Sequence, residues 1–358
     1  MKNICFVNSY TFWGGGEKSY FQYAKELKNR GYKINFLLKK GSVLGKRVEE
    51  EKWAEVKYIK TGNSCQYNPF LFFQMVVFLI KNRIDVIFVN THKDWKAVGI
   101  PAKICGIKKI IYTKGTSDSI GYSYTRQFYF DTVISDVLVK SEDSGKKLLE
   151  TDSKLMAGKI RIIKNGIETE KFKDRRAEQK NESIVLGVTA RLESVKRVSD
   201  LIETANILNK KYGLKFKLLI CGDGDERKNL EKKVAENGLE NVIFFEGFQK
   251  DVISFLNKID IFLFASEMEG MSNSIMEAMA MGKPVICYNI SSMPELVRDG
   301  VNGFLVTPFN IEEFAERIFK LAQDESMRKK FGESSLKIIE EEFSMENVMK
   351  NYEDLVNS

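Results

Sequence analysis

The sequence predicts an α/β protein with two open domains, each built on a parallel sheet. Three observations lead to this prediction. The chain has 358 residues, enough for two domains of ordinary size. Short apolar runs alternate with amphipathic segments in both halves, which is the βαβ pattern of a parallel sheet. Between the halves, residues 173–182 hold no large apolar side chain, as is typical of a linker.

In the first half, the predicted order is strand, loop, helix, strand. Residues 3–7 form a short apolar run, a glycine loop follows at residues 14–16, and residues 17–30 form an amphipathic segment closed by Gly31. The same pattern continues to the end of this half. The remaining strands are expected at residues 33–38, 85–89, 109–112, 132–134 and 160–163, and the helices near residues 93–105 and 141–150.

After Phe172 the pattern restarts, and each domain is expected to hold five or six strands. The tail over residues 311–356 is expected to be helical, because apolar side chains recur there every three or four positions. Ligands of such sheets bind beyond the carboxyl ends of the strands, so the predicted site is the cleft between the domains. The strands of this half are expected at residues 183–188, 216–220, 242–245, 259–264 and 284–287, and the helices at residues 199–212, 226–237 and 273–281.

Composition excludes several classes of protein. Hydrophobic residues make up 43% of the chain and only five residues are proline, so a disordered or collagen-like chain is excluded. The single histidine, His92, excludes multi-histidine metal sites, and a Ser-His-Asp triad would have to use it. Five scattered cysteines without a CxxC pair indicate reduced thiols and therefore a cytoplasmic protein.

No segment is expected to cross a membrane. The most apolar stretch, residues 70–80, is about half as long as the ~20 residues that span a bilayer. Residues 4–7 are followed at once by polar residues and glycines, so we interpret them as a strand rather than as part of a signal peptide.

Charge is divided unevenly along the chain, whose net charge is +7. Residues 1–172 hold 30 Lys and Arg against 17 Asp and Glu, a net charge of +13, which leaves −6 for the rest. Aromatic side chains mix with these cations at residues 67–78 and 122–130, a combination typical of proteins that lie on an anionic membrane surface. The alternative is core aromatics under a solvated basic face, which we favour for residues 70–78. No nucleic-acid-binding motif accompanies the charge, so nucleic acid is not an expected partner.

The segment over residues 265–286 carries the most chemical information. Glu269 and Glu277 are eight positions apart, one just before a predicted helix and one inside it. Between them, Ser272, Asn273 and Ser274 supply N-cap side chains and free backbone N–H groups. Because a helix start carries about half a positive charge, this arrangement can hold a diphosphate, with a carboxylate on each side for sugar hydroxyls. The alternative is an ordinary capped helix with solvated glutamates.

The same segment resembles the Glu-x7-Glu motif of the GT4 family of retaining glycosyltransferases, including its continuation Glu-Ala-Met-Ala-x-Gly-x-Pro-Val. Residues 187–196 resemble the family's Gly-Arg-Leu…Lys-Gly segment. By this resemblance Arg191 and Lys196 would clamp the donor diphosphate, as a guanidinium and an ammonium can. Arg197 departs from the pattern, since the family usually has glycine there.

Further segments fit the resemblance in their order and spacing. Residues 164–172 resemble the Asn-Gly-Ile/Val-Asp…Phe signature that closes the first domain. Gly222 lies in a segment that resembles the family's Gly-x-Gly loop, and Phe248 in one that resembles the loop lining the base pocket. Together the matching segments cover nearly the whole chain.

In the first domain, the resemblance assigns Gly14, Gly15 and Gly16 to a loop that approaches the donor phosphate and the acceptor. The alternative is a tight turn imposed by packing. His92 would stand beside the reacting sugar, or be a structural histidine. Lys114 occupies a position where many relatives have histidine, and it would either suit an anionic acceptor or be exposed and idle.

The resemblance implies a GT-B fold, with two Rossmann-like domains facing a central cleft. Residues 1–172 would bind the acceptor and residues 173–340 the nucleotide-sugar, while a helix over residues 341–358 would pack back on the first domain. Catalysis is expected from Arg191, Lys196, Glu269 and His92, and the acceptor side from Gly14, His92 and Lys114. The expected donor-binding residues are Gly15, Gly16, Arg191, Lys196, Gly222, Phe248, Glu269, Gly270, Met271, Ser272, Asn273, Ser274 and Glu277.

The implied reaction transfers a hexose-type sugar from a UDP- or GDP-sugar to a hydroxyl of a glycan or lipid-linked acceptor, with retention of configuration. Its expected setting is bacterial envelope polysaccharide synthesis, in the cytoplasm or at the inner face of the membrane. No cofactor and no metal are expected, because placed cations and amides would take the charge of the leaving diphosphate. A sugar-nucleotide epimerase and a glycan-binding protein without turnover are the alternatives.

Overall fold

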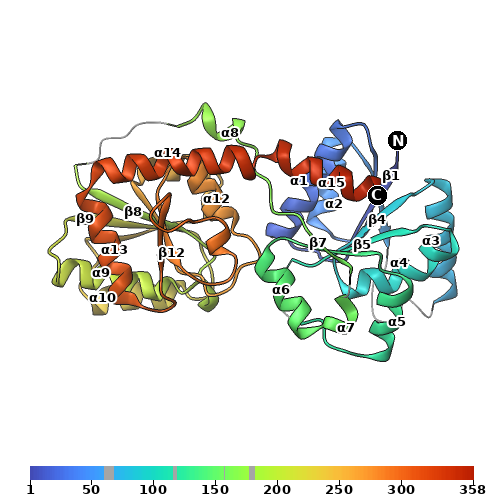
Figure 1. Ribbon diagram of the computed structural model, residues 1–358, viewed down its shortest axis with the longest axis horizontal. Helices are drawn as coiled ribbons and strands as arrows, with labels where there is room; N and C mark the ends of the chain where they lie inside the picture. Colours follow the sequence, from blue (N-terminus) through green and yellow to red (C-terminus); the bar gives the residue numbers. More distant parts are fainter. Residues whose placement is uncertain (60–67, 116–118, 157, 177–181) are drawn as a thin grey trace. The chain divides into compact units, whose positions relative to one another are not determined.

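Both halves of the chain contain an open parallel sheet, as the sequence predicts (Figure 1). The computed structural model describes residues 1–59, 68–115, 119–156, 158–176 and 182–358. Cys65, Tyr67 and residues 177–181 of the predicted linker lie outside the described residues.

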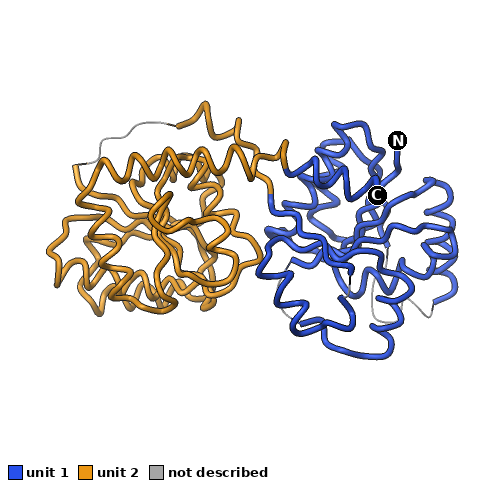
Figure 2. Tube along the Cα trace, in the orientation of Figure 1, with its two compact units in different colours: residues 1–165, 348–358 blue, residues 166–347 orange. Residues whose placement is uncertain are grey.

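By their contacts, the residues form two units (Figure 2). Unit 1 comprises residues 1–165 and 348–358, and unit 2 comprises residues 166–347. The boundaries expected from the sequence at residues 172 and 340, and the cleft between the domains, stay predictions.

The sheet of unit 1 has seven strands in the order β3-β2-β1-β4-β5-β6-β7. From β1 the chain first adds β2 and β3 toward one edge of the sheet, and then β4 to β7 toward the other edge. Right-handed crossovers in the two directions place helices on both faces. The strands are β1 (Asn3–Asn8), β2 (Lys33–Lys39), β3 (Glu55–Ile59), β4 (Val86–Val89), β5 (Lys109–Thr113), β6 (Asp136–Val139) and β7 (Ile160–Ile162). The helices between them are α1 (Gly15–Asn29), α2 (Val43–Glu51), α3 (Pro69–Lys81), α4 (His92–Ile104), α5 (Tyr124–Thr132), α6 (Glu142–Thr151) and α7 (Ser153–Met156).

Two expectations for this unit are wrong. The sheet has one strand more than the upper estimate, because β3 was not recognised. The strand expected at residues 132–134 is the end of α5 and the turn after it. Val133 and Ile134 both donate their backbone N–H to the carbonyl of Tyr129, and the strand starts only at Asp136. Their burial at the helix end accounts for an apolar run that is not a strand.

Unit 2 has a six-stranded sheet in the order β10-β9-β8-β11-β12-β13. Its strands are β8 (Ile184–Thr189), β9 (Phe216–Cys221), β10 (Ile243–Gly247), β11 (Ile261–Phe264), β12 (Val285–Tyr288) and β13 (Gly303–Val306). Its helices are α8 (Glu170–Lys173), α9 (Val198–Lys210), α10 (Arg227–Glu236), α11 (Val252–Lys258), α12 (Asn273–Ala280), α13 (Ile311–Gln323) and α14 (Glu325–Glu342), with short 3₁₀ turns at η2 (Ser194–Lys196) and η3 (Met293–Glu295).

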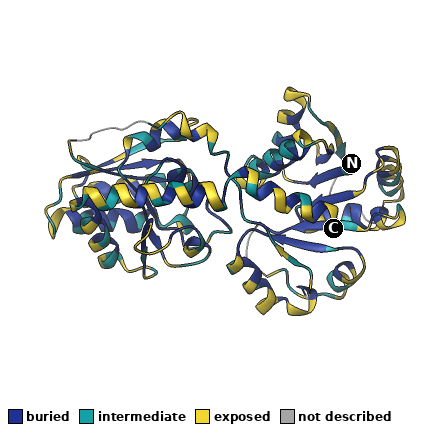
Figure 3. Ribbon diagram, turned by 45° about the horizontal axis from the view of Figure 1, so that its top comes forward, coloured by how far each residue is buried: buried dark blue, intermediate teal, exposed yellow. Residues whose placement is uncertain are grey.

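The central strands are buried on both faces. Every residue of β4, β6, β11 and β12 is buried, as expected for parallel strands covered by helices on each side (Figure 3). The interpretation of aromatic residues 70–78 as core is wrong for Phe70 and Phe73, which are 68% and 66% exposed, whereas Phe78 is buried. No helix among the described residues is both long and apolar enough to cross a bilayer.

The last helix, α15 (Met345–Asn357), contributes its residues from Val348 onward to unit 1. The ring of Tyr352 lies 4.7 Å from that of Tyr23 in α1, and Arg30 forms a 2.8 Å ion pair with Glu353. The Lys140 ammonium, just after β6, donates to the Tyr352 hydroxyl at 2.5 Å and lies over both tyrosine rings. The two ends of the sequence therefore meet in one core.

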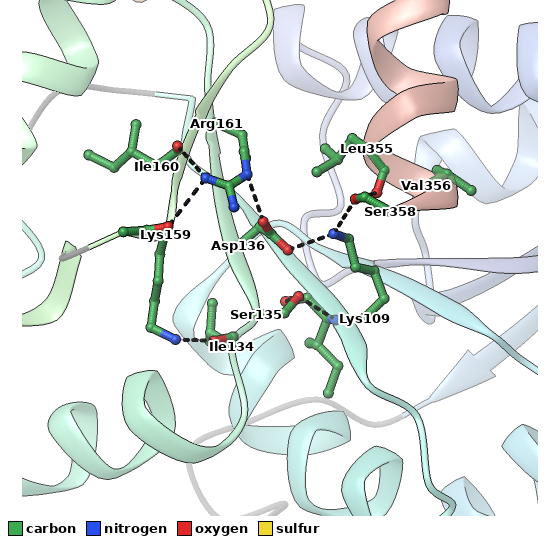
Figure 4. A network of polar contacts seen from close by, with 12 residues as sticks. Lys109, Ile134, Ser135, Asp136, Lys159, Ile160, Arg161, Leu355, Val356 and Ser358 are labelled. Carbon is green, nitrogen blue, oxygen red and sulfur yellow. Dashed lines mark hydrogen bonds and ion pairs between the residues drawn. The ribbon is translucent and has the colours of Figure 1, made fainter.

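A buried carboxylate at the amino-terminal end of β6 joins three strands of unit 1 (Figure 4). Asp136 forms ion pairs with Lys109 of β5 at 3.1 Å and with Arg161 of β7 at 3.0 Å. Lys109 also donates to the Ser358 hydroxyl at 2.8 Å, so the network extends to the end of the chain. A buried charge is tolerated only when it is paired in this way.

Candidate functional site

The carboxyl ends of the strands in unit 2 are joined by backbone hydrogen bonds between consecutive loops. The N–H groups of Ala190 and Leu192, after β8, donate to the carbonyls of Cys221, which ends β9, and of Asp223, just after it. The Gly222 N–H donates to the carbonyl of Gly247, at the end of β10. The loops after β8, β9 and β10 therefore form one connected surface.

Gly222 makes this close approach possible. Its φ is +144°, and a Cβ there would lie 1.8 Å from the carbonyl oxygen of Ala190. Gly224 has a φ of +159°, and a Cβ there would lie 2.5 Å from the carbonyl oxygen of Leu192. No side chain fits at these distances from a backbone atom, so the two loops touch backbone to backbone.

The structure brings together two of the predicted catalytic residues. Lys196 Nζ lies 2.6 Å from Glu269 Oε1, and the two side chains are 15% and 17% exposed. Lys196 comes from η2 after β8, and Glu269 from the loop between β11 and α12. The pair thus joins the two segments that the resemblance singles out.

The loop that carries Glu269 is held on both sides. The Glu267 N–H donates to the Val195 carbonyl beside Lys196. On the other side, the Ser291 hydroxyl donates to the Glu269 carbonyl at 2.7 Å and accepts from its N–H at 3.3 Å. Ser291 has a left-handed backbone, with a φ of 56°, which is uncommon for serine and is found where the surroundings demand it.

Helix α12 begins next to this pair. Ser272 is its N-cap, as predicted, and accepts the Ile275 N–H at 3.3 Å. Ser272 and Met271 are buried, whereas Gly270, Asn273 and Ser274 are half-buried. The first turn, residues 273–276, holds no acidic side chain, so the positive end of the helix is not neutralised from within that turn.

Glu277, in the second turn of α12, is half-buried. Its negative charge, together with that of Glu246, helps to raise the pKa of the Cys221 thiol, although burial is the larger cause. Cys221 ends β9, so Glu277 lies toward the carboxyl ends of β9 and β10. Phe248 follows β10 and is 75% exposed, so its ring is accessible to a ligand.

Arg191 is not part of the Lys196–Glu269 pair. It is 74% exposed and forms a 2.7 Å ion pair with Glu193. A long exposed side chain held by one surface ion pair is released at little cost. Arg191 is therefore free to turn to a ligand without disturbing the fold.

Arg197, where the resemblance expects glycine, adopts the left-handed conformation that glycine favours, with a φ of 47°. Two hydrogen bonds to the buried Asp200 carboxylate, at 2.8 and 3.1 Å, hold its guanidinium, which also lies 4.5 Å from the Phe309 ring centre. The hydroxyl of Tyr288 donates to the same carboxylate at 2.8 Å. Sequence reasoning missed Asp200 and Tyr288, and the only signal was the three-residue spacing of Arg197 and Asp200 at a helix start.

In unit 1, Gly14 is the N-cap of α1, and Gly15 and Gly16 form its exposed first turn. The Glu17 carboxylate is 2% exposed, and it accepts the Gly14 N–H at 3.1 Å and the Asn8 side-chain amide at 3.2 Å. The positive end of this helix is therefore partly neutralised by its own side chain.

His92 is the first residue of α4 and is exposed. Partial burial lowers its pKa, as do the positive charges of Lys96, Lys93 and Arg126. Lys114, just after β5, is 6% exposed, so the expectation that it might be exposed and idle is wrong. Its backbone N–H continues the ladder to Leu138 of β6.

Metal-ligating groups do not gather in the described part of the chain, where no three His, Cys, Asp or Glu side chains cluster as they would around an ion.

Comparison with known proteins shows what the second unit is similar to. Residues 168–337 match the sequence model of the family described as glycosyl transferases group 1. The capsular polysaccharide biosynthesis glycosyltransferase CapM of Staphylococcus aureus is 29% identical over 239 residues, which are 63% of this chain and 62% of CapM. The N-acetyl-alpha-D-glucosaminyl L-malate synthase of Bacillus anthracis is 24% identical over 98% of this chain and 95% of that protein.

The first curated relatives are matched over only part of their own length, namely 62%, 35% and 52% of the three with the strongest matches. Solved structures match the whole chain. A glycosyltransferase from Rickettsia africae ESF-5 has a TM-score of 0.87 at 21% identity, with 99% of this chain and 98% of that chain covered. Anabaena HepE, solved in complex with UDP-glucose, has a TM-score of 0.80 at 22% identity over the full length of both chains.

At these identities the structural matches show the fold alone, which is that of two Rossmann-like domains of the GT-B type. The match to the family model lies within the unit that carries the Lys196–Glu269 pair and the start of α12. Over residues 168–337, the chain therefore matches the family of group 1 glycosyl transferases.

Proposed function

We propose that this protein is a glycosyltransferase that moves a hexose-type sugar from a nucleotide-sugar to a hydroxyl of a glycan or lipid-linked acceptor. We place the reaction in bacterial envelope polysaccharide synthesis, and propose that it proceeds with retention of configuration and without a metal ion. The observation that carries the proposal is the partly buried Lys196–Glu269 pair beside the start of α12. The names of the relatives, which include capsule and lipopolysaccharide core glycosyltransferases, support the biological setting.

Lys196, Arg191 and the amides at the start of α12 would bind the diphosphate of the donor. In the structure, Glu269 balances the charge of Lys196. A diphosphate would take over the ammonium as its counter-charge and free the Glu269 carboxylate to accept hydrogen bonds from the hydroxyls of the sugar. The amides of Ser272, Asn273 and Ser274 would add donors that need no reorganisation.

Glu277 would accept the ribose hydroxyls, and Phe248 with the Gly222 loop would border the base. The half-buried position of Glu277 toward the ends of β9 and β10 supports this role, because those strand ends also carry Gly222 and Phe248. Uracil and guanine are both compatible with such a site. HepE was solved with UDP and with UDP-glucose, which favours the uridine donor.

The acceptor would be handled by unit 1, through Gly14, His92 and Lys114. Because Glu17 already accepts the Gly14 N–H, the amides of Gly15 and Gly16 are the donors that this loop offers to a phosphate. The pKa of His92 is lowered, so its imidazole would be neutral near pH 7 and able to accept a hydrogen bond from a sugar hydroxyl.

In the proposed step, the bond from the anomeric carbon to the leaving phosphate oxygen breaks. A bond to the acceptor oxygen forms on the same face, and the acceptor proton passes to the leaving phosphate. Lys196 and Arg191 would stabilise the negative charge that grows on that phosphate. A lipid-linked acceptor would require the protein to work in contact with the inner face of the membrane.

A nucleotide-sugar screen tests the proposal. Thermal unfolding would be followed with UDP- and GDP-sugars, since a ligand at 100 times its Kd stabilises by about 2.7 kcal/mol. The donor that stabilises most would then be used in transfer assays with glycan and lipid-linked acceptors. Stabilisation by a nucleotide-sugar that Lys196→Ala removes supports the assignment, and wild-type protein that no nucleotide-sugar stabilises would overturn it.

A further inference from the structure

Helix α3 carries a continuous stripe of exposed apolar side chains. Phe70, Phe73, Val77 and Ile80 are 68%, 66%, 45% and 61% exposed. Their spacing of three and four residues places them on one face of the helix. The opposite face holds the buried side chains of α3, so the helix is apolar on its core side and on its solvent side alike.

The apolar surface extends onto α4, which packs beside α3 (Figure 1). Ile104 is 64% exposed and Ile100 is 36% exposed. A hollow between the two helices is lined by apolar side chains of both, with Lys96 as the one charged residue in its lining. We call the exposed residues of the two helices, Phe70, Phe73, Val77, Ile80, Ile100 and Ile104, the α3–α4 face.

Positive charge exceeds negative charge in the segment that carries the α3–α4 face. Residues 69–108 contain six Lys and Arg against two Asp and Glu. One of the two acids, Asp94, is buried and caps its own helix. Lys81, Arg83 and Lys103 are exposed at or just beyond the carboxyl-terminal ends of α3 and α4. An apolar centre with a cationic border complements an anionic, partly apolar partner.

We propose that the α3–α4 face docks on the surface of an anionic lipid bilayer. At 13 residues, α3 is about 20 Å long, too short to cross the ~30 Å hydrocarbon core but well suited to lie in the interface. Its phenylalanines enter the acyl boundary while the lysines and arginines meet lipid phosphates. A second copy of the chain would offer the same positive charge, so self-association gains no charge complementarity.

The sequence left undecided which of two aromatic segments, residues 67–78 or 122–130, lies on a membrane surface. The proposal assigns this role to the α3–α4 face. Tyr122, Tyr124 and Phe128 around α5 are also exposed, at 57%, 86% and 49%. They form a smaller group whose neighbours Tyr129 and Phe130 are buried. The α5 group therefore serves as the matched control for the α3–α4 face within the same unit.

Vesicle flotation tests the proposal with the full chain. Vesicles of phosphatidylcholine alone are compared with vesicles that also contain phosphatidylglycerol. Wild-type protein is expected to float with the anionic vesicles. Phe73→Ser with Ile80→Ser is expected to weaken partitioning at least about tenfold, because two apolar anchors are lost. Tyr124→Ser with Phe128→Ser is expected to leave it unchanged.

Lys81→Gln with Lys103→Gln isolates the electrostatic part. At about 1 kcal/mol for each cation near an anionic surface, the pair is expected to weaken binding to anionic vesicles roughly tenfold or more, with no effect on neutral ones. All the substituted side chains are exposed, so circular dichroism and thermal melting should match the wild type. The UDP-induced thermal shift, which reports on unit 2, should persist in every variant. A loss of docking is thereby distinguished from a failure of the sugar-transfer proposal.

Three results would each overturn the proposal: wild-type protein that does not float with anionic vesicles, an α3 variant that floats as well as wild type, or an α5 variant that fails equally. Light scattering adds a further test. If the wild type is a dimer that the α3 substitutions dissociate, the face is a protein interface and the docking proposal falls.

Discussion

The two units share one topology, yet the helices that follow the matching strands β4 and β11 begin in opposite ways. In unit 1, α1 and α4 begin with buried carboxylates, Glu17 and Asp94, that bond back to the capping residues. In unit 2, α12 begins with the neutral Ser272 and no acid in its first turn. The same architecture can therefore use the positive end of a helix for its own stability or keep it for an anionic ligand.

The loops of the two units also differ in the contacts that fix them. Those of unit 2 are fixed by backbone hydrogen bonds and by glycines that no larger residue can replace. Those of unit 1 depend on buried side chains such as Glu17 and Lys140. A site fixed by backbone leaves its side chains available to the substrate, which fits unit 2 as the unit that matches the family.

The largest effect is expected from Lys196→Ala. Removing the ammonium that would stabilise the leaving diphosphate should lower kcat about a thousandfold. It should also lower the free energy of unfolding, because the mostly buried Glu269 carboxylate loses its counter-charge. Lys211→Ala, at an exposed lysine of the same unit, is the control. Normal turnover in Lys196→Ala would remove the basis for placing the chemistry in unit 2. Arg191→Ala is also expected to lower turnover strongly and, because Arg191 is exposed, to leave the melting temperature unchanged.

Gly222→Ala tests whether backbone contact fixes the loops of unit 2. A Cβ placed 1.8 Å from the Ala190 carbonyl oxygen should destabilise the protein by at least about 3 kcal/mol in urea unfolding. Gly213→Ala is the matched control, because Gly213 also has a positive φ, 58°, but has open space around it. It should cost only about 1 kcal/mol. Equal effects would show that conformation rather than contact matters at Gly222.

Glu277→Ala should weaken nucleotide binding about 10- to 100-fold by calorimetry, because a carboxylate that accepts two hydroxyl groups would be lost. Glu246→Ala, which removes the other carboxylate near Cys221, should change the affinity much less. Unchanged affinity in Glu277→Ala would refute the ribose role.

Lys140→Met tests how a buried side chain contributes to the stability of unit 1. Burial lowers the pKa of Lys140 to about 7, while the rings of Tyr23 and Tyr352 and the Tyr352 hydroxyl surround it. Above about pH 7, Lys140 is mostly deprotonated in the folded protein but still protonated in the unfolded chain. Raising the pH therefore favours the folded state, and the free energy of unfolding should rise by about 2 kcal/mol between pH 7 and 9. The pKa values of Tyr20 and Tyr352 are raised by burial, so these groups do not titrate in that range. In Lys140→Met the rise should disappear, and a rise of the same size would assign it to another group.

The sequence predicted unit 2 better than unit 1, for a physical reason. The Ser272 cap, the strand before it and the helix over residues 273–281 all leave local signals, namely a capping residue, an apolar run and a helical period. The contact between Lys196 and Glu269 joins residues 73 positions apart, and only the motif resemblance indicated it.

In unit 1, the sequence did not show which faces of a helix are buried and which are exposed. An apolar run such as residues 70–80 looks the same whether its second face meets the core or the solvent, so the exposure of Phe70 and Phe73 could not be predicted. In unit 2, the side-chain contacts of Arg197 with Asp200 and Phe309 were hidden as well, because neither partner marks a turn in the sequence. Only the resemblance, which expects glycine at position 197, indicated a left-handed backbone there.

Helix α15 also determines when unit 1 can finish folding during synthesis. Most of unit 1 is translated before unit 2, but the contacts of Tyr352, Glu353 and Ser358 with it form only after these residues have been made. By its contacts, unit 2 ends at residue 347. During synthesis, the first unit therefore waits for residues made after the second, with Lys140 still lacking the Tyr352 hydroxyl.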